Sequence, residues 1–203
     1  MKRILNLLCM AIFISSSSLA FAAIGPDELV KTTAEDVLAI VKKDKDIQAG
    51  DQKKIFALTE EKILPNFDFD HVSQLVLGKN WNKASKEQQD AFQKEFRSLL
   101  LRTYATALSK YRNQTIEYKP LRAQPTDTEV TVKTAIVQPG GQPIGVDYTL
   151  AKTGDNWKVF DITIEGVSLV TNYRSQFNTE VRQSGMDGLI QKLVDKNKEN
   201  AAK

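Results

Sequence analysis

The chain has 203 residues, with 28 lysines and arginines against 25 aspartates and glutamates, and its formal net charge of +3 is too small for a nucleic-acid-binding surface. A single cysteine and a single histidine exclude an internal disulfide and a metal site built from several such ligands. The length is sufficient for one domain with a sizeable hydrophobic core.

The N-terminus has the pattern of a secretory signal peptide. Lys2 and Arg3 precede an apolar run at 4–14, and Ala-Phe-Ala at 20–22 fits the small-x-small cleavage rule. The apolar run is short for a membrane span, although a retained anchor is the alternative. We therefore predict a signal peptide over residues 1–22, cleavage that removes the only cysteine, and export to the periplasm.

Helical patterns fill the first half of the remaining chain. One helix is predicted to start at 26–28, where a proline precedes two acids, and its far end at 42–46 is predicted to be solvated. A second helix spans 52–64 and ends at a proline, and a third, shorter helix follows it. Ser85 and a glutamine three residues later form a capping box that starts the longest helix, which keeps one apolar face for about five turns.

Strand patterns follow. Apolar side chains alternate with polar ones along several short segments separated by glycine-rich turns at 139–141 and 154–156. Tight turns join consecutive strands in antiparallel order. The predicted strands are 114–118, 130–136, 144–150 and 157–164.

The last of these strands is predicted to turn directly into a helix within residues 165–168, with Ser168 as the N-cap. An amphipathic helix at 187–194 follows, and the polar tail from about Lys196 is predicted to be frayed. The fold class predicted is α+β: an antiparallel four-stranded sheet covered by helices, in one domain over residues 23–203. The space between the corner helix and the sheet is expected to hold something apolar.

Reactive groups are scarce. His71 is the only histidine and is most simply a surface or core-edge residue. Asp147 and Asp161 alternate with apolar neighbours, so structural roles are favoured for both, with Asp161 pairing with a base or holding a turn. Tyr104 and Tyr148 could place hydroxyls in a cavity, although aromatic residues at such spacings usually belong to the core. We predict no catalytic residue, no metal and no enzyme.

The ordered set of segments resembles the MlaC family, also called toluene-tolerance auxiliary proteins. The matching segments are 63–68, 76–81 with Ala84, Ser85 and Gln88, the long helix from Tyr104 to Tyr111 with the strand opening at Gln114, 157–161, 165–168 and 185–189. The resemblance implies a nuclear-transport-factor-like (cystatin-like) cone with an apolar cavity that binds phospholipid. It also implies two partners: an outer-membrane lipoprotein–porin complex and the MCE-domain component of an inner-membrane ABC transporter. It implies no cofactor besides the lipid.

A soluble carrier must shield its lipid, and the helix–sheet interface is where the apolar faces concentrate. We predict a monomer, and basic residues near the mouth, such as Arg97, Arg174 or Arg182, are candidates for the surfaces that contact partners. Two alternatives stay open: an enzyme on the same cone that uses Asp161 or Tyr104, and a periplasmic interaction module without a ligand. The predicted lipid-binding residues are Leu75, Phe96, Leu99, Leu100, Tyr104, Val132, Ile136, Val146, Tyr148, Ile162, Val167 and Val170.

Overall fold

A computed structural model describes residues 24–124 and 126–201, so the predicted signal peptide lies outside the described residues. Within the described ranges, no helix combines the length and the apolar character that crossing a bilayer requires. The helices are α1 (Pro26–Lys43), α2 (Lys45–Ala49), α3 (Gln52–Leu58), α4 (Phe69–Leu77), α5 (Lys86–Tyr104) and α6 (Leu169–Ala201). The strands are β1 (Thr115–Tyr118), β2 (Glu129–Val137), β3 (Ile144–Thr153), β4 (Asn156–Ile164) and β5 (Val167–Ser168).

The strands form one antiparallel sheet in the order β1-β2-β3-β4-β5, which confirms the predicted α+β class but adds a fifth strand to the four predicted. The extra strand arises at the predicted corner. Glu165 and Gly166 both have positive φ, 49° and 79°, and this pair makes the tight turn that lets β5 pair back onto β4. A positive φ is uncommon for a residue other than glycine, so the pattern of the sequence gives little sign of this turn.

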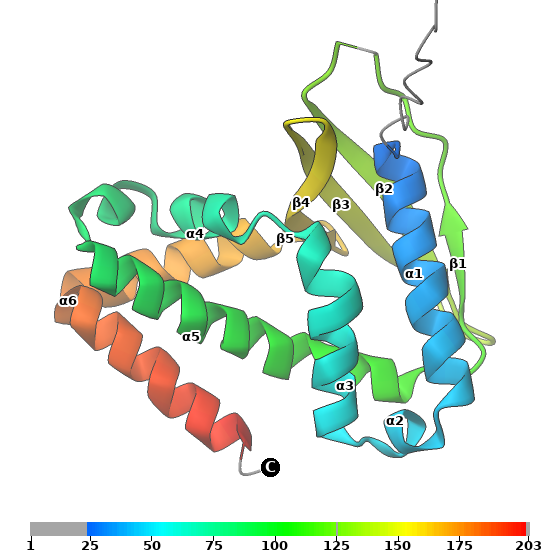
Figure 1. The fold of residues 1–203 in the computed structure, drawn as a ribbon, viewed down its shortest axis with the longest axis horizontal. Coiled ribbons are helices and arrows are strands. Elements are labelled where there is room, and N and C mark those ends of the chain that lie inside the picture. The colour runs from blue at the N-terminus through cyan, green and yellow to red at the C-terminus, as the bar shows by residue number, and fades with distance from the viewer. Residues whose placement is uncertain (1–23, 125, 202–203) are drawn as a thin grey trace, which may run out of the picture.

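Helices flank this sheet in two groups (Figure 1). α1 lies along the sheet, while α4, α5 and α6 pack on one another to the side of it. The pairing of β3 with β4 contains a bulge between Thr149 and Leu150. Val159 packs toward α1, whereas Phe160, which the register leaves without a partner at the bulge, packs among the helices α4 to α6. Two consecutive residues of β4 therefore pack against different groups of helices.

The buried apolar residues that the structure describes, except Val146, form three clusters. Cluster 1 joins α4, α5 and α6 around Phe92 and Phe96; cluster 2 joins α1, α2, α3 and the end of α5 around Val41 and Ile55; cluster 3 joins α1 to the sheet around Val132. The capping box predicted at Ser85 is confirmed, because its hydroxyl accepts from the backbone N–H of Gln88.

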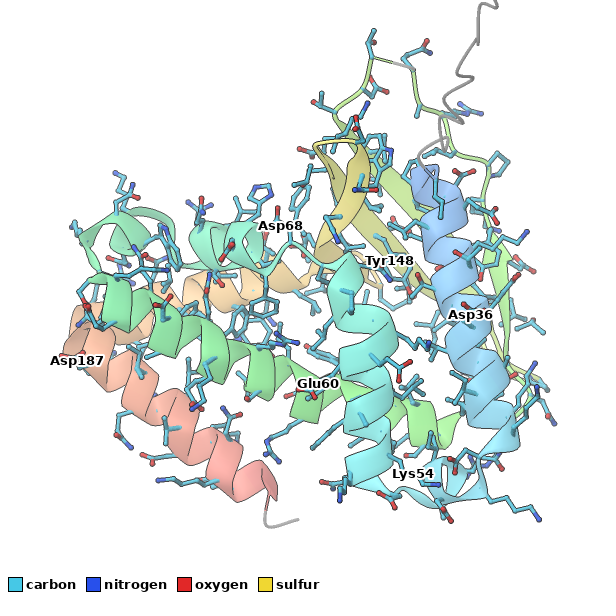
Figure 2. All side chains as sticks on the ribbon, viewed as in Figure 1. Asp36, Lys54, Glu60, Asp68, Tyr148 and Asp187 are labelled. Atoms are coloured by element: carbon cyan, nitrogen blue, oxygen red, sulfur yellow. The ribbon has the colours of Figure 1, made fainter. Side chains whose placement is uncertain are left out.

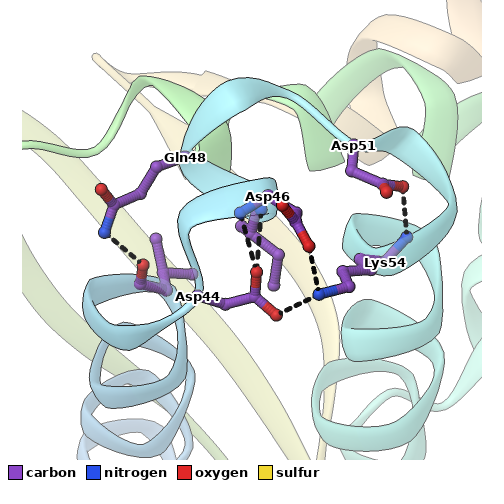
Figure 3. Close-up of polar contacts among 7 residues, drawn as sticks. Asp44, Asp46, Gln48, Asp51 and Lys54 are labelled. Carbon is purple, nitrogen blue, oxygen red and sulfur yellow. Dashed lines mark hydrogen bonds and ion pairs between the residues drawn. The ribbon is translucent and has the colours of Figure 1, made fainter.

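The first three helices are joined by a charged turn (Figure 3). Asp44 ends α1 and caps α2 by accepting from the backbone N–H groups of Asp46 and Ile47. Lys54 Nζ on α3 lies 2.9 Å from Asp44 Oδ2 and 2.7 Å from Asp46 Oδ2. These hydrogen bonds, first to Asp46 and then to Asp44, raise the pKa of Lys54. The segment predicted as a solvated helix end is thus a connection that anchors α3 against the end of α1.

A short strap connects α3 to the sheet edge. The predicted helix at 52–64 changes after Leu58 into a π-helical turn, Thr59–Ile63, and then a 3-10 turn, Leu64–Asn66. Asp68 N–H then donates to Val159 O at 2.9 Å, and Lys158 Nζ donates to Pro65 O at 2.5 Å. The strap therefore fixes the start of α4 along β4.

The last helix, α6, breaks at Gly185, whose φ of 72° and ψ of −176° fall in a region that glycine alone adopts readily. The second half includes the predicted amphipathic helix at 187–194 and packs against cluster 1 through Leu189 and Leu193. The tail expected to fray from Lys196 is instead helical through Ala201. Asn197 explains the difference, because it is buried and its amide donates to Glu95 O and Glu95 Oε2, both at 2.9 Å.

Candidate functional site

One face of the sheet carries a continuous set of apolar side chains, which we call the apolar strip: Ile116, Ile136, Ile144, Val146 and Ile164. The register places Ile116 beside Ile136 and Ile136 beside Ile144, and it places Val146 beside Ile164. Residues paired across neighbouring strands, or two apart on one strand, point to the same face of a sheet. The strip therefore runs across four strands on one surface.

The strip continues the face that α1 covers, but it is packed differently. Val132, Tyr148 and Ile162 form the next row of this face and belong to cluster 3 beneath α1. The strip residues are half-buried, or in the case of Val146 only 7% exposed, yet none belongs to the three clusters formed by the described residues. Shielded apolar side chains outside the packed clusters are those that a ligand could cover.

Polar groups on this face are few. Thr134 is buried between the strip and cluster 3, and its hydroxyl donates to Val146 O at 2.7 Å, so it is already satisfied. Burial, more than the neighbouring Tyr118, raises the pKa of Tyr148 to about 12. Tyr148 lies on the sheet between α1 and α3 in the view of Figure 2. The face therefore offers apolar surface and two neutral phenols, those of Tyr118 and Tyr148.

The corner after β4 is held by Asp161. Its carboxylate accepts from the Ser168 hydroxyl at 2.5 Å and from the Val170 N–H at 3.0 Å, while Ser168 Oγ accepts from the Thr171 N–H at 3.0 Å. The predicted N-cap at Ser168 is confirmed. Asp161 joins β4 to the first turn of α6, where a carboxylate is favourable because free N–H groups point toward it. This is the turn-holding role favoured from the sequence.

Replacing Asp161 with alanine is expected to lower the free energy of unfolding by about 2 kcal/mol, because a half-buried cap and two hydrogen bonds to a carboxylate are lost together. Asp161→Asn keeps an acceptor oxygen and should cost about half as much. Urea unfolding measures both. If the free energy of unfolding of the alanine variant lies within about 0.5 kcal/mol of that of the original protein, as for a neutral surface change, the corner does not depend on this residue.

The structure distributes the predicted lipid-binding residues over several environments. The apolar strip includes Ile136 and Val146, and Tyr104 and Val167 are 36% and 56% exposed. Whether any of them contacts lipid stays a prediction. Cluster 1 or its edge contains Leu75, Phe96, Leu99, Leu100 and Val170, and cluster 3 or its edge contains Val132, Tyr148 and Ile162.

Three strip residues, Ile116, Ile144 and Ile164, are missing from the predicted set although their strands were predicted. The period-two alternation that placed Val146 on the apolar face applies equally to Ile144, two residues earlier, and to Ile164, its partner on β4. The signal was therefore present in the sequence, but it required the strand register to be recognised as one surface.

A separate open groove of about 1290 Å³ lies between the strap, α4, α5 and the β3–β4 hairpin. Both acidic and basic side chains line it, including Asp68, Asp70, Lys94 and Arg97, and the predicted lipid-binding residues are absent from its lining. His71 also lines the groove, and its ring lies 4.6 Å from that of Phe160. The mixed charge distinguishes this groove from the apolar strip.

The basic residues predicted near the mouth differ in their local contacts. Arg97 lines the charged groove, whereas Arg174 and Arg182 are exposed on α6. The side chain of Arg174 lies over Gly78, and Arg182 donates to the Thr179 hydroxyl at 3.2 Å. Each of the three therefore has its own local surroundings.

Comparison with known proteins identifies a matching family. The family described as MlaC protein matches residues 31–195, from α1 to the second half of α6. The chain is 27% identical to toluene tolerance protein ttg2D of Pseudomonas putida, over 87% of this chain and 81% of that protein. It is 25% identical to the intermembrane phospholipid transport system binding protein MlaC of Haemophilus influenzae, over 86% and 83% of the two chains.

A solved structure has the same fold. It is that of a phospholipid-binding protein from Ralstonia solanacearum in complex with a phospholipid; it is 41% identical, its TM-score is 0.83, and the alignment covers 88% of this chain and 99% of that one. The match confirms the predicted α+β fold. Since the family match extends over most of the sequence, the chain belongs to the MlaC family.

Proposed function

We propose that this protein is a periplasmic phospholipid carrier that holds acyl chains against the apolar strip. The observation that carries the proposal is the strip itself: a shielded apolar face, continuous over four strands, outside the packed clusters of the described residues. The phospholipid complex of the Ralstonia relative supports this choice of ligand. The Haemophilus relative, named as a binding protein of intermembrane phospholipid transport, supports the role in transport.

The energetics favour an enclosed site. Each methylene removed from water contributes about 0.8 kcal/mol, so two chains of about 14 methylenes contribute roughly 20 kcal/mol. A carrier that leaves much of this surface in water would lose most of that contribution. The strip adjoins the interface between α1 and the sheet, where apolar side chains come from more than one side, as they would not on a flat surface patch.

A carrier must also release its lipid. Binding that depends mainly on apolar burial tolerates different chains and head groups, because apolar contacts are not directional. We propose that the carrier is a monomer that exchanges lipid with an outer-membrane lipoprotein–porin complex and with an MCE-domain component of an inner-membrane ABC transporter.

A transfer assay tests the carrier function. Protein recovered from the periplasm of expressing cells is mixed with donor vesicles that contain a self-quenched fluorescent phospholipid and with unlabelled acceptor vesicles. The protein should accelerate dequenching in proportion to its concentration, with the label recovered in the acceptor vesicles. A rate equal to that of vesicles alone, or a label that leaves the donor without a dependence on protein, would contradict the proposal.

A further inference from the structure

The phenol of Tyr148 is a polar group on a largely apolar face, which also carries Tyr118 and Thr134. The register places Tyr148 beside Val132 on one side and Ile162 on the other, with the strip residue Val146 two positions away on its own strand. A phenol in such surroundings keeps a hydrogen-bond donor that apolar neighbours cannot satisfy, and an unsatisfied donor away from water costs free energy.

The hydroxyl of Tyr148 borders accessible space. The sealed side-chain polar atoms without a partner, among the residues that the structure describes, are Arg102 Nε and Asn197 Oδ1, and the Tyr148 oxygen is not one of them. It also makes no hydrogen bond to another described residue, and the side chain is only half-buried. The side chain is therefore enclosed while its oxygen keeps some accessible surface, and the raised pKa, caused mainly by burial, agrees with this position.

We propose that the Tyr148 hydroxyl donates a hydrogen bond to an ester carbonyl of the bound lipid, an inference that rests on the proposed function. The acceptor must be neutral, because Val132 and Ile162 on either side would leave an anionic phosphate oxygen in apolar surroundings at a high desolvation cost. Ester carbonyls are the neutral acceptors of a diacyl phospholipid, and they lie where its acyl chains begin. Tyr148 then marks the depth at which the acyl chains enter the strip.

The proposed hydrogen bond does not require Tyr148 to gain or lose a proton. With a pKa of about 12, Tyr148 keeps its proton and stays a donor at every physiological pH. A phenylalanine in its place preserves the ring that packs in cluster 3 and removes only the donor. The substitution therefore separates the hydrogen bond from the packing.

Competition between ester and ether lipids tests the proposal. The protein is loaded from vesicles that contain equal amounts of dioleoyl phosphatidylethanolamine and its dialkyl ether analogue, which lacks the carbonyl oxygens, and the bound lipids are counted by mass spectrometry. The original protein should prefer the ester by about fivefold, the ratio that one neutral hydrogen bond supplies. Tyr148→Phe should bind both lipids at a ratio near one.

The matched control is Tyr111→Phe, which removes a tyrosine hydroxyl in cluster 2, and it should keep the ester preference. An original protein that binds both lipids equally would overturn the inference, as would a Tyr148→Phe protein that keeps the preference or a control that loses it. Each of these results leaves the carrier function standing. Failure of the original protein to take up either lipid would instead overturn the proposed function.

Discussion

Replacing Val146 with aspartate is expected to reduce the phospholipid content of the purified protein at least about a hundredfold. Val146 is 7% exposed and lies within the strip beside Ile164. A carboxylate at this position would have to lose its water against an acyl chain, and a desolvation cost of about 3 kcal/mol or more corresponds to a factor of a hundred or greater in affinity. The measurement is the amount of lipid phosphorus per protein after purification.

Two further variants separate lost binding from lost folding. Thr131→Asp places the same charge at an exposed position on the opposite face of the sheet and should leave the lipid content unchanged. Ile136→Trp adds volume to the strip without a charge and should displace lipid while the protein stays folded, as judged by circular dichroism. A folded Val146→Asp protein with full lipid content would show that acyl chains bind elsewhere.

Replacing Phe96 with alanine is expected to lower the free energy of unfolding by about 4 kcal/mol, because the change leaves a cavity in the centre of cluster 1. The Phe96 ring is 1% exposed, and its centroid lies 5.1 Å from those of Tyr173 and Phe177 and 5.4 Å from that of Phe92. Such edge-to-face and stacked contacts add to the area that the ring buries. Urea unfolding followed by tryptophan fluorescence measures the loss.

The size of this effect also decides the role of Phe96, which the sequence places among the lipid-binding residues. If Phe96 is a core residue, its replacement by alanine should lower the free energy of unfolding with or without lipid. Phe96→Leu refills most of the volume and should lower it by less than about 1.5 kcal/mol. If Phe96 instead contacts lipid, the replacement by alanine would lower stability mainly in the lipid-loaded protein. A loss below about 1 kcal/mol in the lipid-free protein would contradict the packing described for cluster 1.

The local features of this fold are predictable from the sequence because each depends on a few neighbouring residues. The caps at Ser85 and Ser168 need only a hydroxyl before a helical pattern, and both are confirmed. The alternation along β2, β3 and β4 predicts the strands and their apolar face. The corner at 165–168 combines both kinds of signal.

Features that depend on tertiary contacts are not predictable in this way. The strand β5 needs a positive φ at Glu165, which the side chain does not favour, and the helical tail depends on the buried contact of Asn197 with Glu95. The same limit applies to the site. Phe96 and Val146 both carry the periodicity of buried apolar residues, yet one lies in a packed cluster and the other outside all three. Periodicity reports that a side chain avoids water, and it does not report whether protein or ligand covers it.

Native mass spectrometry of the protein, purified from the periplasm under mild conditions, tests the carrier function most directly. The intact protein should carry an added mass equal to one phospholipid, distributed over species that match the mixed chains and head groups of the cell membrane, because apolar burial selects weakly among them. Collisional activation should release these species and leave the bare chain. A protein that carries no lipid, or that carries a single ligand of another chemical class, would contradict the account.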